Sequence, residues 1–159
     1  AVGIPVEAEI GKIGGAEEHV VVSEKEATMT DPEEAVRFVE DGGFDFLAVA
    51  IGNAHGFYKG EPELDFDRLE AIRDAVPVPL VLHGASGIPD HQITAAVKRG
   101  ICKINIDTEV RNAFAQTVKK FQKENPDIID PRKILAPAID AMQEVVEHKM
   151  EIFRSAGRA

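Results

Sequence analysis

The chain alternates short apolar runs with longer amphipathic stretches, and this order limits its possible folds more than any other feature. The short runs, rich in apolar and β-branched residues, predict strands at residues 4–11, 44–52, 79–84 and 101–107. The longer stretches carry apolar residues at three- and four-residue spacing, and they predict helices at residues 31–43, 65–77, 89–100, 108–125 and about 131–153. Strands and helices that alternate in this way predict a parallel sheet covered by helices.

Two α/β architectures fit this order of elements. An open doubly wound sheet and a βα barrel both bring the carboxyl ends of their parallel strands to one rim, where the loops form the functional site. A complete barrel typically needs about 250 residues for eight units, whereas only four units are visible in these 159 residues. From spacing alone we slightly favour the open sheet.

Composition excludes several classes of partner. The formal charge of -10, from 28 acidic and 18 basic residues, argues against a surface for nucleic acid or anionic membrane. The single cysteine, Cys102, rules out a disulfide framework, and we interpret it as core packing within a strand. No apolar run approaches the roughly 20 residues of a membrane span, and the first residues do not read as a signal peptide. The default location is therefore the cytoplasm.

Two histidines at the ends of predicted strands are the strongest chemical signal. His55 and His83 are each followed by glycine, and the neighbouring strand ends would bring them to the same rim. Imidazole is a common zinc ligand, but a catalytic zinc ion usually has three protein ligands. The pair therefore predicts a shared metal ion whose third ligand comes from elsewhere.

Small and polar residues at the same rim predict an anion site. The turn at residues 84–86 precedes a predicted helix and can present backbone N–H groups and a hydroxyl. Residues 105–108 add amide, hydroxyl and backbone donors, while Lys59 and Arg111 add positive charge to an acidic protein. Each feature alone has an ordinary structural explanation, but together they indicate a phosphate cradle.

The loop after the first predicted strand has two readings. Gly14 and Gly15 would give it mobility, and Glu17 and Glu18 could then enter a closed site. The alternative is an ordinary glycine turn with solvated acids.

These motifs resemble a known family. The segments "VEAEIGKIGGAEE", "GNAHGFYKGEP", "PLVLHGASGIPD" and "KINIDTEVRNAF" are similar, in order and spacing, to the carboxyl-terminal half of class II, zinc-dependent fructose-bisphosphate aldolases and the closely similar tagatose-bisphosphate aldolases. The likeness continues through "DPRKILAPAIDAM" and covers essentially the whole chain. It implies a (β/α)8 TIM barrel instead of the open sheet, with residues 1–159 forming the second half of a single barrel domain whose amino-terminal half is absent from this chain.

The resemblance also implies roles for individual residues. It implies Zn²⁺ as the cofactor, bound by His55 and His83, with Glu9 at an alternative metal position and room for a monovalent cation in addition. Glu17 would be the catalytic proton carrier. The implied substrate-binding residues are Gly56, Lys59, Gly84, Ala85, Ser86, Asn105, Ile106, Asp107, Thr108 and Arg111.

The implied activity is the reversible cleavage of fructose 1,6-bisphosphate to dihydroxyacetone phosphate and glyceraldehyde 3-phosphate. In the family, a further zinc histidine directly after a catalytic aspartate lies in an earlier segment. We therefore expect the chain to be incomplete by itself and to associate with a complementary amino-terminal half or with itself. Cleavage of tagatose bisphosphate, and a non-catalytic fragment that binds sugar phosphate, are the alternatives.

Overall fold

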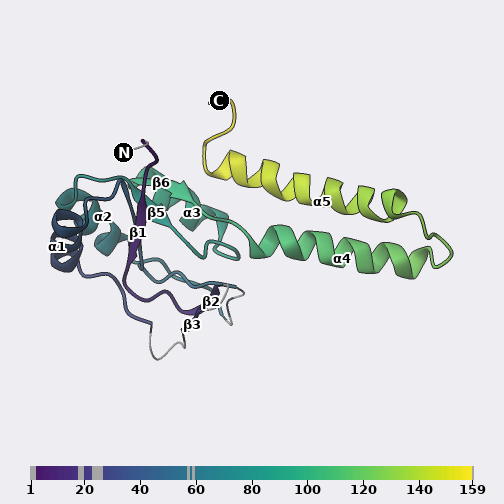
Figure 1. Ribbon diagram of the computed structural model, residues 1–159, viewed down its shortest axis with the longest axis horizontal. Helices are drawn as coiled ribbons and strands as arrows, with labels where there is room; N and C mark the ends of the chain where they lie inside the picture. The colour runs from purple at the N-terminus through teal and green to yellow at the C-terminus, as the bar shows by residue number, and fades with distance from the viewer. Residues whose placement is uncertain (1–2, 18–19, 23–26, 57, 59, 159) are drawn as a thin grey trace. The chain divides into compact units, whose positions relative to one another are not determined.

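The computed structural model describes residues 3–17, 20–22, 27–56, 58 and 60–158. Two compact units make up the chain (Figure 1). The first, here called the sheet unit, is Ala1–Asn105, and the second, called the hairpin unit, is Ile106–Ala159.

The sheet unit is built on a parallel sheet with the strand order β1-β4-β5-β6. Its strands are β1 (Glu7–Ile10), β4 (Phe46–Val49), β5 (Leu80–Leu82) and β6 (Ile101–Ile104). Glu7 pairs with Phe46, Leu47 with Leu80, and Leu80 with Ile101, so the strands follow one another in sequence across the sheet. All four predicted strands are therefore confirmed, and their carboxyl ends lie at one edge of the sheet.

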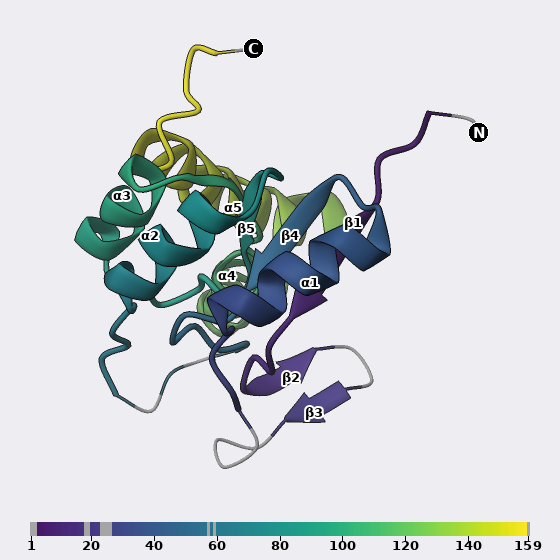
Figure 2. The same cartoon turned by 90° about the vertical axis from the view of Figure 1, so that its left-hand side faces the viewer.

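Helices cover the apolar strands of this sheet. α1 (Pro32–Gly42) and α2 (Phe66–Ala75) lie side by side on one face of the sheet, and α3 (Asp90–Lys98) leads into β6 (Figures 1 and 2). β4 and β5 are almost completely buried, which explains why their sequences are continuously apolar rather than alternating. The largest buried side chains of the core are those of Leu47, Ile51, Leu69, Ile72, Leu80, Leu82 and Ile93.

Local sequence signals fix the ends of α1. The Asp31 carboxylate accepts hydrogen bonds from the backbone N–H groups of Glu33 and Glu34, and Pro32 occupies the first helical turn. Gly43 ends the helix in the left-handed region with φ of 63°. The predicted boundaries at Asp31 and Gly43 are therefore confirmed.

A small antiparallel pair of strands follows β1 where the sequence suggested only a loop. β2 (Gly15–Glu17) pairs with β3 (Val20–Val22), and Figure 2 shows them beyond the end of β1. Gly14, directly before β2, forms an isolated bridge with Ala54 in the loop after β4.

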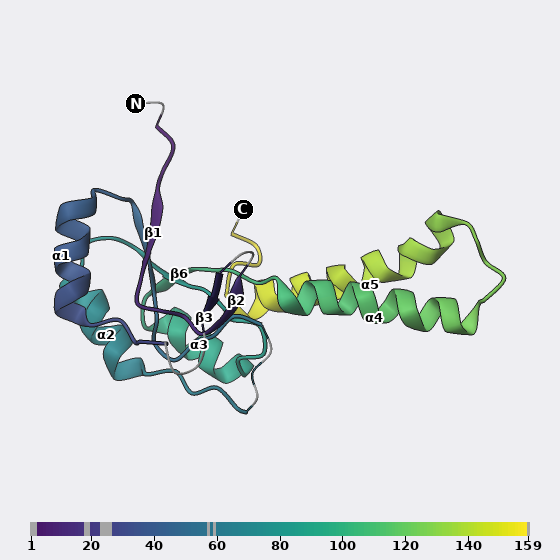
Figure 3. The same ribbon diagram turned by 60° about the horizontal axis from the view of Figure 1, so that its bottom comes forward.

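The hairpin unit consists of two long helices. α4 (Thr108–Glu124) and α5 (Pro131–Ile152) run antiparallel and pack along their length (Figures 1 and 3). Pro131 lies in the first turn of α5, where its missing N–H costs nothing, whereas Pro137 lies inside the helix. Both helices match their predicted spans to within about one residue at each end.

One expectation about the core is wrong. Cys102 is exposed rather than packed in the core. β6 is an edge strand that pairs only with β5 among the described strands, and both Cys102 and Lys103 are exposed on it. Among the described helices, none combines the length and apolar character needed to cross a membrane.

Candidate metal centre

Three side chains from neighbouring strand ends meet at the carboxyl edge of the parallel sheet. Glu9 lies in β1, His55 in the loop after β4, and His83 directly after β5. Each offers one ligand atom, and these atoms all lie within 4.8 Å of one another. Two imidazoles and one carboxylate are a donor set that suits a catalytic zinc ion. Glu9 thus lies where it could act as a third donor beside the histidine pair.

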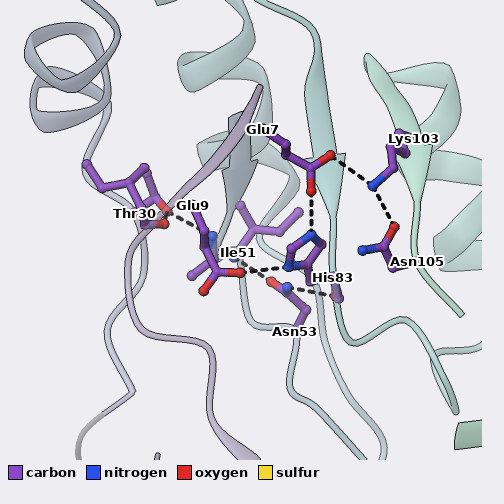
Figure 4. A network of polar contacts seen from close by, with 10 residues as sticks. Glu7, Glu9, Thr30, Ile51, Asn53, His83, Lys103 and Asn105 are labelled. Carbon is purple, nitrogen blue, oxygen red and sulfur yellow. Dashed lines mark hydrogen bonds and ion pairs between the residues drawn. The ribbon is translucent and has the colours of Figure 1, made fainter. Parts of the chain in front are cut away.

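His83 lies between two carboxylates. Its Nδ1 is 2.7 Å from Glu9 Oε2 and its Nε2 is 2.9 Å from Glu7 Oε1, as Figure 4 shows. The hydrogen bond to Glu9 is the main cause that raises the pKa of His83; burial opposes it, and Glu7 adds to it. Both ring nitrogens face carboxylate oxygens, and these contacts favour the charged form of the ring. A metal ion that bound one of the nitrogens would have to displace its proton.

Glu7, on the outer strand β1, is bonded to a lysine on β6, the outer strand at the other side of the sheet. Lys103 Nζ on β6 donates to Glu7 Oε2 at 2.8 Å and to Asn105 Oδ1 at 2.7 Å (Figure 4). Burial tends to raise the pKa of Glu7, but the bonds and charges of Lys103 and His83 outweigh it and lower that pKa. Neighbouring strands lie about 4.8 Å apart, so a flat sheet would separate its edges by roughly 14 Å. Side chains from both edges meet here, so this face of the sheet is concave.

Buried polar side chains fix the backbone beneath this network. Asn53 is 5% exposed; its Nδ2 donates to the His83 carbonyl at 2.9 Å, and its Oδ1 accepts from the Ile51 N–H at 2.8 Å. Thr30 joins β1 to β4 in the same manner, donating to the Ile10 carbonyl and accepting from the Ala50 N–H (Figure 4). These bonds hold the strand ends at a fixed spacing.

The backbone around both histidines is closely packed. The His55 N–H donates to the Gly14 carbonyl at 2.7 Å. Gly84, directly after His83, has φ of 61°, and a Cβ there would collide with the Ala54 carbonyl. Only glycine meets both the conformational and the steric requirement at this position. The glycine after His83 is thus explained by the approach of the two loops.

The predicted phosphate turn follows His83 directly. Ala85 and Ser86 are 0% and 3% exposed, and the Ile88 N–H donates to the Ala85 carbonyl to close the turn. Gly84, Ala85 and Ser86 thus form a closed turn, with Ala85 and Ser86 buried, that continues directly from the candidate ligand His83. Asn105, through Lys103 and Glu7, belongs to the same network.

The other predicted site residues are spread over both units. Gly56 lies in the sheet unit, directly after His55, and the remaining predicted substrate-binding residues that the structure describes lie in the hairpin unit. Ile106 begins the hairpin unit, Thr108 is the first residue of α4, and Arg111 pairs with Asp107 through Nε and Oδ1 at 2.7 Å. Gly56 adopts φ of 85°. For Glu17 the structure describes the backbone in β2 but not the side chain, and Lys59 and Glu18 lie outside the described residues.

Sequence reasoning missed three residues of this network: Glu7, Asn53 and Lys103. A signal for two of them was present, because side chains two positions apart on a strand share a face. Glu7 therefore lies on the face of Glu9, and Lys103 on the face of Asn105. The amide of Asn53 had no such signal, since its role depends on how closely two loops approach each other.

Comparisons with known proteins agree with this architecture. The family model "Fructose-bisphosphate aldolase class-II" matches residues 1–158. A fructose-bisphosphate aldolase of Thermus caldophilus is 47% identical over all of this chain and 60% of its own length.

Solved structures show the same likeness. The YdjI aldolase of Escherichia coli is 43% identical with a TM-score of 0.82, and the match covers 99% of this chain and 52% of that one. A fructose-bisphosphate aldolase from Campylobacter jejuni is 26% identical with a TM-score of 0.72, covering 96% and 52%. The chain thus spans about half the length of these structures, and the α/β fold with a parallel sheet, as in half of an aldolase barrel, is confirmed. From its sequence and its fold together, the chain belongs to the class II fructose-bisphosphate aldolase family.

Proposed function

We propose that this chain contributes half of the active site of a zinc-dependent aldolase that reversibly cleaves fructose 1,6-bisphosphate to dihydroxyacetone phosphate and glyceraldehyde 3-phosphate. The observation that carries the proposal is the cluster of Glu9, His55 and His83 at the carboxyl ends of parallel strands. A barrel enzyme performs its chemistry at this rim. Membership of the class II aldolase family supplies the reaction class.

His55 and His83 would hold the zinc ion, with Glu9 as the third donor. When bound, the ion would act as a Lewis acid on the ketone of the substrate. Glu7 and Lys103 keep the His83 ring in place through the hydrogen bond to its Nε2. Lys103 donates to the oxygen of the Asn105 amide, and the N–H groups of that amide would donate to oxygens of the substrate.

The turn of Gly84, Ala85 and Ser86 would receive a phosphate group of the substrate. Its position directly after His83 would put an anion site next to the proposed metal site, which would suit dihydroxyacetone phosphate. Gly56, Lys59, Asn105, Ile106, Asp107, Thr108 and Arg111 would complete substrate binding, and Glu17 would carry a proton. A monovalent cation would bind in addition to zinc.

The remaining strands of the barrel would come from a complementary amino-terminal half, on the same or another polypeptide. β1 and β6 each have one neighbour among the described strands, so each presents an edge that parallel strands could extend. We propose that residues 1–159 are the second half of a single barrel domain and that the complementary half adds further groups to the metal site.

The test is an assay for triose phosphate release with zinc and the complementary half, on fructose and tagatose bisphosphates in parallel. His55→Ala and His83→Ala should each abolish cleavage and lower zinc content, because each leaves the ion short of a ligand. His91→Ala, on an exposed position of α3, is the matched control and should keep both. Full activity with normal zinc in His83→Ala would overturn the proposal, and faster turnover of tagatose bisphosphate would reassign the substrate.

A further inference from the structure

Tyr58 connects the two histidine loops through a single oxygen atom. Its Oη accepts a hydrogen bond from the Ala54 N–H at 2.7 Å and donates one to the Gly84 carbonyl at 2.8 Å. Ala54 directly precedes His55, and Gly84 directly follows His83. The phenol therefore joins the backbones next to both candidate histidine ligands.

The surroundings of this oxygen make the bridge stiff. A tyrosine hydroxyl has one proton to donate, and here it donates that proton to the Gly84 carbonyl. The same oxygen accepts a hydrogen bond from the Ala54 N–H. Burial raises the pKa of Tyr58, against the opposing effect of the Ala54 N–H bond, so the phenol stays protonated and can donate. The ring lies near Gly87, within the same turn as Gly84.

The backbone at residues 54–55 is fixed on its other side as well. The His55 N–H is bonded to the Gly14 carbonyl, and the Ala54 carbonyl lies against Gly84. Asn53 adds a bond to the His83 carbonyl. Without the Tyr58 hydroxyl, the Ala54 N–H and the Gly84 carbonyl would lose the bonds that set how far apart the two loops stand.

We propose that Tyr58 is a positioning residue that sets the separation of His55 and His83 and so the metal affinity of the site. The inference rests on the proposed metal role of these histidines, and it assigns the hydroxyl no contact with the metal or the substrate. Residues that orient metal ligands change metal affinity when they are removed, typically by 10- to 100-fold.

The decisive variant is Tyr58→Phe, which keeps the ring and removes the hydroxyl. The matched control is Gln92→Met. The buried Gln92 side chain also makes two bonds to backbone, accepting from Leu64 and donating to Pro62, but neither residue adjoins a histidine. Zinc affinity is measured by competition with a chromophoric chelator, and the visible spectrum of the Co²⁺-loaded chain reports the geometry around the metal. Thermal unfolding of the metal-free chain monitors stability.

We expect Tyr58→Phe to weaken zinc binding by about tenfold and to change the Co²⁺ spectrum. Gln92→Met should lower the unfolding midpoint about as much as Tyr58→Phe does. It should nevertheless bind zinc like the parent. Equal zinc affinity in Tyr58→Phe and the parent, or an equal loss in Gln92→Met, overturns the positioning role.

A measurement on the unsubstituted chain covers the case in which Tyr58→Phe does not fold. Zinc should slow hydrogen exchange at the Ala54 amide by at least tenfold, and an unchanged rate overturns the inference. Failure of the proposed function has a different signature. In that case His83→Ala binds zinc as tightly as the parent, whereas failure of this inference alone leaves the His83→Ala defect intact.

Discussion

The sheet unit and the hairpin unit are built from equally regular elements but bury their side chains very differently. In the sheet unit, every residue of β5 and nearly every residue of β4 is buried. In the hairpin unit, α4 has no buried residue, and α5 buries only Ala138 and Lys149. Helical periodicity therefore predicts an element correctly without telling whether that element has a core of its own.

The hairpin unit also leaves apolar side chains exposed along α5. Leu135, Ile139, Val146 and Met150 are 38–57% exposed. The sheet unit obtains its stability from burial, whereas two helices packed on each other bury too little to stand alone by the same means. Substitutions in the two units should consequently change the free energy of unfolding by different amounts. Four experiments test this expectation.

The largest expected effect is the loss of a core leucine from the sheet unit. Leu47 is completely buried in β4, so Leu47→Ala should lower the free energy of unfolding by about 2–5 kcal/mol. Leu135→Ala, on the exposed side of α5, should cost less than about 0.5 kcal/mol. Urea unfolding of both variants is the measurement. A large loss in Leu135→Ala would mean that the hairpin unit depends on this face as strongly as the sheet unit depends on its core.

The second effect concerns an ion pair of the hairpin unit in which only the lysine is buried. Lys149 Nζ lies 2.7 Å from Glu109 Oε2, and the lysine side chain is only 8% exposed against 24% for the glutamate. Glu109→Gln should cost about 2 kcal/mol because it takes the carboxylate from a buried ammonium group. Lys149→Met should cost less, because the carboxylate that it leaves without the lysine is the more exposed group of the pair. The methionine side chain would also make apolar contacts in place of the ammonium group. Equal losses of stability in the two variants would contradict the expectation that the more buried lysine is the costlier group to leave without its partner.

The third comparison is between the caps of two helices. Asp31 caps α1 with two side-chain hydrogen bonds, so Asp31→Ala should cost about 1 kcal/mol. Asp107 occupies the same position in α4 but makes no capping bond, and its pair with Arg111 is well exposed. Asp107→Ala should therefore leave the free energy of unfolding nearly unchanged. Thermal unfolding at neutral pH distinguishes the two, and a loss in Asp107→Ala as large as that in Asp31→Ala would contradict the comparison.

The smallest expected effect is on how the free energy of unfolding changes with pH. This effect should arise in the sheet unit. The pKa of His83 is raised in the folded chain by Glu9, despite burial. Its stabilisation is therefore fully present below the unfolded pKa of about 6.5 and is lost as pH rises through the higher folded pKa. Urea unfolding of the chelator-treated chain between mildly acidic and alkaline pH should show this loss.

His83→Asn is the informative variant for that slope, and His91→Asn is its control. We expect His83→Asn to remove the part of the slope due to His83 and His91→Asn to retain it, because His91 is exposed on α3. Identical pH profiles for His83→Asn and the parent would show that the two carboxylates do not stabilise the imidazolium.

The same contrast explains how far the sequence could predict the molecule. The parallel strands and the five helices follow from periodicity and caps, and the paired histidines follow from strand ends on one rim. The ion pair of Glu7 with Lys103 could not be predicted, because it depends on the curvature that brings opposite sheet edges together. β2 and β3 have three residues each, too few for a reliable pattern. The exposure of Cys102 depends on the place of β6 at the edge of the sheet, which its apolar neighbours do not reveal.

The place of Tyr58 between the histidine loops has an optical consequence. It is the only tyrosine among the 159 residues, which include no tryptophan. Fluorescence and near-ultraviolet circular dichroism at tyrosine wavelengths therefore arise from one ring beside the candidate metal centre. Changes in these signals would report the state of the two loops, while the helical signal in the far ultraviolet would follow the rest of the chain. A difference between the two melting curves would reveal loops that open before the sheet unfolds, with no label attached to the chain.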